Sequence, residues 1–149
     1  MTIQATKKQI DKIDINDALI KTINEKSKNV ISLIQKNIEK LHSVAFANSL
    51  GAEDMVLVDL IRKNKLNVEI FSIDTGRLPS ETYHLIQEVE DKYQFKIKIY
   101  FPNQEKVESY VNTHGINAFY NSLDLRKSCC GIRKVEPLNR ALKDKKAWI

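Results

Sequence analysis

Hydrophobic residues follow two different spacings along the chain. Between residues 15 and 41 they recur three and four positions apart, which predicts one or two amphipathic helices. Short continuous apolar runs at 43–47, 68–73 and 95–101 predict buried strands. Residues 148–149 have the composition of a further strand at its first positions.

Polar turns and further helical segments separate the predicted strands. Helical spacing recurs at 54–63, 81–93, 105–113 and 128–143. Ser80 is a residue type favoured as the N-cap of the second of these helices. Strands that alternate with helices favour a parallel sheet covered on both faces, with right-handed crossovers. The predicted fold class is therefore α/β.

The sequence predicts one domain preceded by a loosely structured start. Residues 1–14 are predicted to be flexible, and residues 15–149 are predicted to form one α/β domain. No apolar run approaches the roughly 20 residues of a membrane helix, and no apolar stretch typical of a secretory signal opens the chain. We therefore expect a cytoplasmic protein without a membrane partner.

The charge balance is basic, with 24 Lys and Arg residues against 19 Asp and Glu residues and a net charge of +5. Either a lysine-rich overall composition or a field that attracts anions explains this balance. The basic residues are scattered, without the interleaved aromatic residues of a nucleic-acid-binding stripe. We expect no nucleic-acid partner.

The loop after the first predicted strand is a candidate anion site, because parallel sheets bind ligands beyond the carboxyl ends of their strands. Backbone N–H groups around Gly51, with Asn48 and Ser49 as further donors, can hold a phosphate or sulfate oxygen. An ordinary capped turn is the alternative interpretation. Glu53 and Asp54 complement the helix dipole and are interpreted as structural residues.

The loop after the second strand combines an acid, a glycine and an arginine. Asp74 ends the strand, and Arg77 is predicted to pair either with this carboxylate or with an oxyanion of a ligand. A plain turn set by Gly76 and Pro79 is the alternative.

Cys129 and Cys130 are the two cysteines of the chain, and they are adjacent. Their adjacency gives no support to an extracellular disulfide framework, and a bond between neighbours is strained, which leaves metal ligation, redox chemistry or a pair of buried free thiols. Two thiols cannot complete a site that needs about four ligands. Positive charge surrounds the pair, from Arg126, Lys127, Arg133 and Lys134.

Three ordered motifs resemble the sulfonucleotide reductases, and above all the adenosine 5′-phosphosulfate (APS) reductases. They are SLGAEDMVLVDL at 49–60, FSIDTGRLPSETY at 71–83 and CCGIRKVEPLNRAL at 129–142. The resemblance covers the chain from about Leu41 to Ile149. It implies that residues 15–149 are a nucleotide-binding domain of the adenine-nucleotide α-hydrolase-like (Rossmann-like) fold, incomplete at its C-terminal end. The implied reaction is reduction of APS to sulfite and AMP with electrons from thioredoxin.

The resemblance also assigns roles to single residues. Asn48 to Gly51 correspond to a modified phosphate loop, the backbone of Ile73 lies where relatives contact adenine, and Lys134 matches a lysine near the sulfate. Cys129 and Cys130 match the first half of a four-cysteine [4Fe-4S] ligand set. The residues predicted to bind the substrate are Asn48, Ser49, Leu50, Gly51, Ile73, Asp74, Arg77, Arg133 and Lys134.

Family features beyond this sequence include an arginine-rich segment, a later CxxC pair and a tail cysteine that acts as nucleophile. We therefore expect a chain that is inactive alone and carries half of the cluster ligands. Three alternatives stay open: a reductase for the 3′-phosphorylated substrate (PAPS), an ATP-pyrophosphatase-type adenylating enzyme, and a non-catalytic nucleotide-binding module. Leu50 and Ala52 disfavour the adenylating enzyme. The oligomeric state also stays open, with a homo-oligomer allowed.

Overall fold

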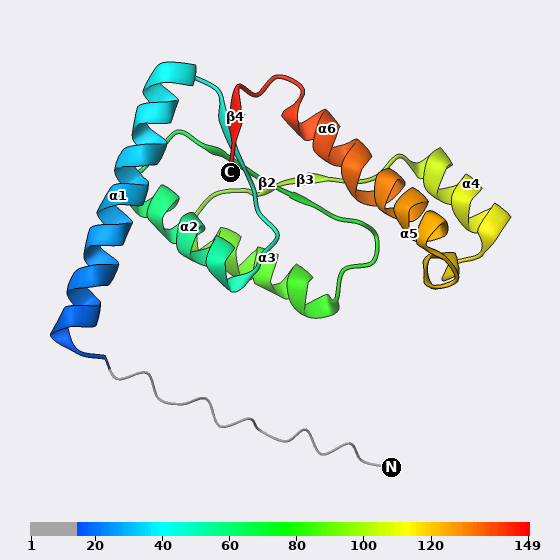
Figure 1. Cartoon of the computed structure of the whole chain (residues 1–149), viewed down its shortest axis with the longest axis horizontal. Coiled ribbons are helices and arrows are strands. Elements are labelled where there is room, and N and C mark those ends of the chain that lie inside the picture. Colours follow the sequence, from blue (N-terminus) through cyan, green and yellow to red (C-terminus); the bar gives the residue numbers. More distant parts are fainter. Residues whose placement is uncertain (1–14) are drawn as a thin grey trace, which may run out of the picture.

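The protein is described by a computed structural model that covers residues 15–149 (Figure 1). The predicted flexible segment 1–14 lies outside the described residues. A four-stranded parallel sheet has the order β3-β2-β1-β4, which confirms the predicted α/β class. The strands are β1 (Val44–Ala47), β2 (Glu69–Ile73), β3 (Lys98–Tyr100) and β4 (Ala147–Trp148).

Helices connect the strands and cover the sheet. The segment predicted as one or two helices is a single helix, which begins after Asn16 and ends at His42. The Asn16 side chain accepts the Leu19 N–H at 2.9 Å, and His42 takes a left-handed conformation that ends the helix. The helical elements are α1 (Asp17–Leu41), α2 (Ala52–Lys63), α3 (Ser80–Tyr93), α4 (Gln104–His114), the 3₁₀ turn η1 (Ala118–Tyr120), α5 (Leu123–Cys130), the π-helical turn η2 (Gly131–Val135) and α6 (Glu136–Leu142).

Alternate residues of the strands pack on opposite faces of the sheet. Phe46 and Ile70 join the larger core under α1, α2 and α3, whereas Ala45 and Phe71 pack against α6. Figure 1 shows α2 and α3 on one side of the strands and α6 on the other. Both faces are therefore covered, as the sequence predicts for a parallel sheet.

A third, smaller core lies among α4, η1 and α5. Its buried residues are Tyr110, Ala118 and Cys129. The Tyr110 hydroxyl donates to the Leu125 carbonyl at 2.9 Å and ties α4 to α5. We call α4, η1 and α5 together the cysteine-bearing helices, although both cysteines belong to α5. Figure 1 shows these helices at the end of the molecule away from α1.

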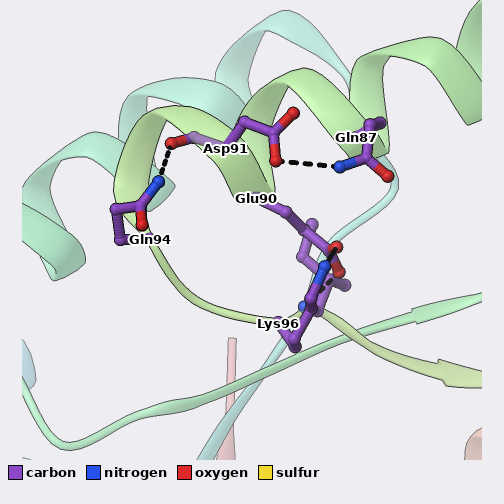
Figure 2. Close-up of polar contacts among 6 residues, drawn as sticks. Gln87, Glu90, Asp91, Gln94 and Lys96 are labelled. Atoms are coloured by element: carbon purple, nitrogen blue, oxygen red, sulfur yellow. Dashed lines mark hydrogen bonds and ion pairs between the residues drawn. The ribbon is translucent and has the colours of Figure 1, made fainter.

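The turn from α3 to β3 is held by a buried carboxylate (Figure 2). Glu90 accepts the Ile97 N–H at 2.9 Å and the Lys96 ammonium at 2.5 Å. Burial raises the pKa of Glu90, but the hydrogen bonds from Lys96 and Ile97 outweigh it and hold the pKa below its ordinary value. Gln94, in a left-handed conformation, ends α3 and donates to the Asp91 carbonyl.

This turn explains why β3 is shorter than predicted. The sequence predicts a strand at 95–101, but the Phe95 N–H bonds back to Glu90 and the Ile97 N–H is taken by the Glu90 side chain. These donors are unavailable to the sheet, so pairing begins at Lys98.

Two predicted helix starts are also corrected. Ser80 is the first residue of α3 rather than its N-cap, because Pro79 has the extended conformation of the cap position. The last helical stretch begins at Leu123, where the Ser122 hydroxyl accepts the Leu125 N–H, and not at 128. Among the helices of residues 15–149, none is long and apolar enough to cross a membrane.

Candidate functional site

A cavity of about 330 Å³ opens at the carboxyl edge of β1 and β2. This is where a parallel sheet is expected to bind its ligand. Apolar side chains dominate the lining, among them Leu50, Ile73, Leu78, Leu138 and Trp148. The polar residues of the lining are Asn48, Ser49, Ser72, Thr75, Thr82 and Lys134.

The loop from β1 to α2 directs its backbone donors at oxygens of the chain itself. Asp54 accepts both the N–H and the hydroxyl of Ser49, at 2.6 and 2.7 Å. The Asn48 side-chain oxygen accepts the Leu50 N–H at 2.8 Å, and Leu50 has a positive φ of 66°. The loop is thus preformed, and a phosphate that used the Ser49 donors would have to displace Asp54. The supporting role predicted for Asp54 fits these contacts.

Asn48 lines the cavity and carries a buried donor without a partner in the described part of the chain. Its side chain is 2% exposed, and among the described residues its Nδ2 has no hydrogen-bond partner. A buried donor left unpaired costs about 1–3 kcal/mol. A ligand acceptor in the cavity would remove that cost, which makes Nδ2 a candidate ligand contact.

Lys134 brings positive charge to the same cavity from η2. It lines the cavity with Asn48 and Ser49, although the three residues come from segments far apart in the sequence. The structure therefore brings Asn48 to Leu50 of the predicted phosphate loop, Ile73 and Lys134 to one cavity, whereas Gly51 lies outside its lining.

Asp74 and Arg77 lie beside this cavity and outside its lining. Asp74 is 5% exposed; its carboxylate accepts the Gly76 N–H at 2.7 Å and the Tyr83 hydroxyl at 3.0 Å. The hydrogen bond to Asp74, with burial, raises the pKa of Tyr83. Asp74 thus shapes the β2–α3 turn, in which Gly76 has a positive φ of 71°.

Arg77 does not pair with Asp74, one of the two partners predicted for it. Its guanidinium donates to the Ile116 carbonyl at 3.2 Å and to the Asn117 side chain at 3.0 Å, and lies 4.8 Å from the ring centre of Phe119. The Arg77 guanidinium therefore binds the carbonyl and amide oxygens just before η1 and the ring within η1, and not the Asp74 carboxylate. Arg77 holds the cysteine-bearing helices to the β2–α3 loop.

Arg133, in η2 directly after α5, makes a second contact with the β2–α3 loop. Its guanidinium donates to the Thr75 carbonyl at 2.6 Å, and it is not part of the cavity lining. A Cβ on Gly76 would lie 3.2 Å from this guanidinium, so the close approach also favours glycine there.

The two cysteines point in different directions from the end of α5. Successive residues of a helix project about 100° apart. Cys129 is buried against Tyr110 and Ala118, whereas Cys130 is exposed. Within residues 15–149 no group of three or more His, Cys, Asp and Glu side chains is placed to hold a metal ion. The thiols fit a soft metal or an iron–sulfur cluster in donor type, and they supply two donors.

The family model described as the phosphoadenosine phosphosulfate reductase domain matches residues 43–149. The match includes both loops at the carboxyl edge of the sheet, Lys134 and the cysteine pair. The chain belongs to the phosphoadenosine phosphosulfate reductase domain family.

Relatives with known names agree with this family. The adenosine 5′-phosphosulfate reductase of Allochromatium vinosum is 46% identical over 119 residues, which cover 80% of this chain and 46% of that protein. That of Burkholderia cepacia is 46% identical over 132 residues, covering 89% of this chain and 53% of that protein. This chain thus spans about half the length of these reductases.

A solved structure has the same fold. The phosphoadenylyl-sulfate (PAPS) reductase of Candida auris, determined in complex with phosphate, is similar to this chain with a TM-score of 0.59 and 27% identity. The similar region covers 89% of this chain and 64% of that one.

Two features of this reductase-family chain were not predicted from its sequence. One is the pairing of Ser49 with Asp54, whose signal is the five-residue separation across a helix N-terminus. The other is the π-helical turn between α5 and α6, whose signal is a Pro137 within an otherwise helical stretch.

Proposed function

We propose that this chain is the nucleotide-binding portion of an enzyme that reduces adenosine 5′-phosphosulfate to sulfite and AMP. The observation that carries the proposal is the cavity at the carboxyl edge of the sheet, where Asn48, Ser49 and Lys134 meet. The names of relatives that are 46% identical support the same substrate.

The cavity suits the two ends of such a nucleotide. Its apolar lining, including Leu50, Ile73 and Leu138, matches the flat surface of adenine, while the backbone at Ile73 and the free Nδ2 of Asn48 supply polar contacts. Lys134 provides the cation for the phosphosulfate. Because Asp54 already occupies the Ser49 donors, the anion is expected nearer to Lys134 than to the loop backbone.

The reaction needs a nucleophilic thiolate. The thiolate attacks the sulfur of the phosphosulfate, a covalent enzyme S-sulfonate forms, and the S–O bond breaks so that AMP leaves with the bonding electrons. One thiol of a dithiol partner, which we propose to be thioredoxin, then attacks the enzyme sulfur, so that sulfite leaves and a mixed disulfide forms. The partner's second thiol breaks this bond, which frees the enzyme thiol and leaves the partner as its disulfide. Lys134 stabilises the negative charge of the phosphosulfate while the thiolate attacks its sulfur.

Neither thiol of this chain suits the nucleophile. Cys129 is buried, and Cys130 is fixed in the last turn of a helix, whereas the attacking thiol must reach the sulfur and then meet the partner. We propose that both are ligands of a [4Fe-4S] cluster whose remaining ligands lie outside this pair. As ligands, Cys129 and Cys130 would tie α5 to the segment that carries the other ligands.

The 3′-phosphorylated nucleotide is the second candidate substrate. The family description and the Candida auris structure both concern enzymes of that substrate. The relatives named APS reductase and the cysteine pair favour APS.

Calorimetric titration tests the proposed ligand. We expect APS to bind more tightly than PAPS, with an affinity that falls as salt is raised. Lys134→Ala is expected to weaken APS about tenfold, the effect of losing a charged contact, and to weaken AMP less. Lys127→Ala, which removes an exposed lysine of the same helical segment, is the matched control.

Two results would contradict the proposal. One is the absence of any saturable binding of APS or AMP. The other is an equal loss of APS affinity in the Lys134→Ala and Lys127→Ala variants. In an activity assay with thioredoxin, we expect no sulfite from the 149-residue chain, and sulfite that disappears with Cys130→Ser would show that the thiols are assigned wrongly.

A further inference from the structure

The helical rod that runs from α5 into α6 contains one wide turn. Figure 1 shows α5 and α6 as consecutive parts of one rod. Between them, η2 (Gly131–Val135) is π-helical, and the Glu136 N–H donates to the Gly131 carbonyl, five residues back. The conformations on both sides, at Cys130 and Glu136, remain right-handed helical. The rod therefore gains one residue in this turn without breaking.

Pro137 is the physical cause of this turn. A proline has no N–H, and its ring clashes with the carbonyl four residues back, which here belongs to Arg133. A regular α-helix cannot continue through that position. After the wide turn, Pro137 falls in the first turn of α6, where a missing N–H is tolerated. Pro137 is also fully buried, so its ring is fixed by packing.

The wide turn changes the angle around the helix axis between the side chains of Cys129 and Lys134. In an uninterrupted α-helix, five steps of about 100° would leave Lys134 about 140° around the rod from Cys129. One additional residue in the turn reduces this angle to about 40°. Cys129 can then pack against Tyr110 while Lys134 lines the nucleotide cavity.

Packing on both sides fixes the two ends of the rod. Leu138 and Ala141 pack against the sheet, next to Phe71, which is fully buried. Cys129 packs in the smaller core of the cysteine-bearing helices. If the turn closed to a regular helix, the contacts of α6 with the sheet and those of Cys129 with the smaller core could not both be kept. The contacts of Cys129 bury less apolar surface, so they are the ones that would be lost.

We infer that Pro137 is a positioning residue: it maintains the wide turn that sets the Cys129–Cys130 pair and Lys134 at their relative angle. The geometric part of this inference is independent of the ligand, and its meaning for catalysis rests on the proposed function. A restored N–H at position 137 allows the α-helix to close, and it turns Cys129 out of its core.

The test combines a hydrogen-bond measurement with thiol reactivity. Pro137→Val restores the N–H and largely keeps the buried volume, and Pro137→Ala is the second variant. NMR couplings across hydrogen bonds identify the acceptor of the Glu136 N–H, which we expect to change from Gly131 to Ile132. The alkylation rate of Cys129, relative to that of exposed Cys130 in the same molecule, is expected to rise at least tenfold.

A compensating deletion separates positioning from packing. Gly131 has no heavy atom within 4 Å of an added Cβ, so its removal takes no side-chain contact away. Deletion of Gly131 in the Pro137→Val background returns the angle between Cys129 and Lys134 to about 40° in a regular helix. We therefore expect the double change to restore protection of Cys129. Leu138→Ala, which removes packing beside the proline, should leave the Glu136–Gly131 bond intact.

Three outcomes would overturn the inference: a Glu136 N–H that still bonds to Gly131 in both proline variants, a Cys129 that stays as protected as in the parent, or a deletion that fails to restore its protection. The amides of Ala45 and Phe71 report in each variant whether the sheet is folded. Because none of these measurements uses a nucleotide, failure of APS to bind would contradict the proposed function and leave the role of Pro137 standing.

Discussion

The sheet and the cysteine-bearing helices are held together in different ways. Around the sheet, fully buried side chains such as Phe46 and Phe71 pack on both faces. Around α5, the core consists of Tyr110, Ala118 and Cys129 with a few half-buried neighbours. Arg77 joins the cysteine-bearing helices to the β2–α3 loop, and Arg133 of η2 binds the same loop. The difference indicates a rigid sheet with its cavity beside cysteine-bearing helices that open more easily.

The largest expected effect comes from the sheet core. Phe71→Ala removes a fully buried ring between the sheet and α6, and we expect it to lower the free energy of unfolding by about 3–5 kcal/mol. Urea denaturation followed by circular dichroism measures the change. Tyr120→Ala, which removes an aromatic ring that is 79% exposed, is the control and should change stability little. A loss below 1 kcal/mol for Phe71→Ala would refute the assignment of the rigid core.

Acid should weaken the sheet side through Glu90. Its pKa is lowered in the folded state from an ordinary value of 4.5, so its stabilisation is present above that value and is lost as pH falls through the folded pKa. Glu90→Gln is expected to cost about 1–2 kcal/mol at neutral pH through the loss of charged hydrogen bonds. Below pH 4 the two proteins should approach each other in stability, and a difference that grows with acid would contradict this account.

Removal of the Arg77 contacts should open the thiol site and leave the sheet closed. Arg77→Ala removes two hydrogen bonds and a stacking contact at an exposed position, about 1 kcal/mol together. That change corresponds to about a fivefold faster alkylation of Cys129 relative to Cys130. Arg126→Ala is the matched control on α5. Equal rates in the two variants would show that Arg77 does not hold these helices.

Replacing either of two glycines by alanine is expected to change the stability of the protein slightly, with opposite signs at the two positions. Gly131 has helical dihedral angles and open space for a Cβ, so Gly131→Ala should stabilise the protein by about 0.5–1 kcal/mol. Gly115 also has open space, but its φ of 98° disfavours any side chain, so Gly115→Ala should destabilise it. Thermal unfolding midpoints compare the two variants. If both substitutions changed stability in the same direction, backbone conformation would not be the deciding factor.

The sheet could be predicted from the sequence because its signals are local. Apolar runs marked β1 and β2, and the polar loop after β1 identified Asn48 and Ser49 at the cavity, whereas Ile73 was identified through the family resemblance. The start of β3 could not be predicted in this way. It depends on the Glu90 carboxylate taking a backbone donor seven residues away, a contact that hydrophobic spacing does not encode.

The thiol side was less predictable for a related reason. The partner of Arg77 lies about 40 residues further along the chain, and competing oxygens of similar chemistry lie much nearer in sequence. The wide turn before Pro137 changes which residues share a side of the rod, whereas periodicity arguments assume an unbroken helix. The roles of Cys129 and Cys130 as cluster ligands stay a prediction.

NMR titration of the amide resonances with APS and with AMP tests the central claim most directly, namely that the nucleotide binds at the carboxyl edge of the sheet. The amides of Ser49, Ile73 and Lys134 are expected to shift most, and Lys134 should respond more strongly to APS than to AMP. The amides of α4, which lie outside the cavity lining, should change little. Shifts concentrated in α4, or no saturable shifts at Ser49 and Ile73, would contradict the proposed site.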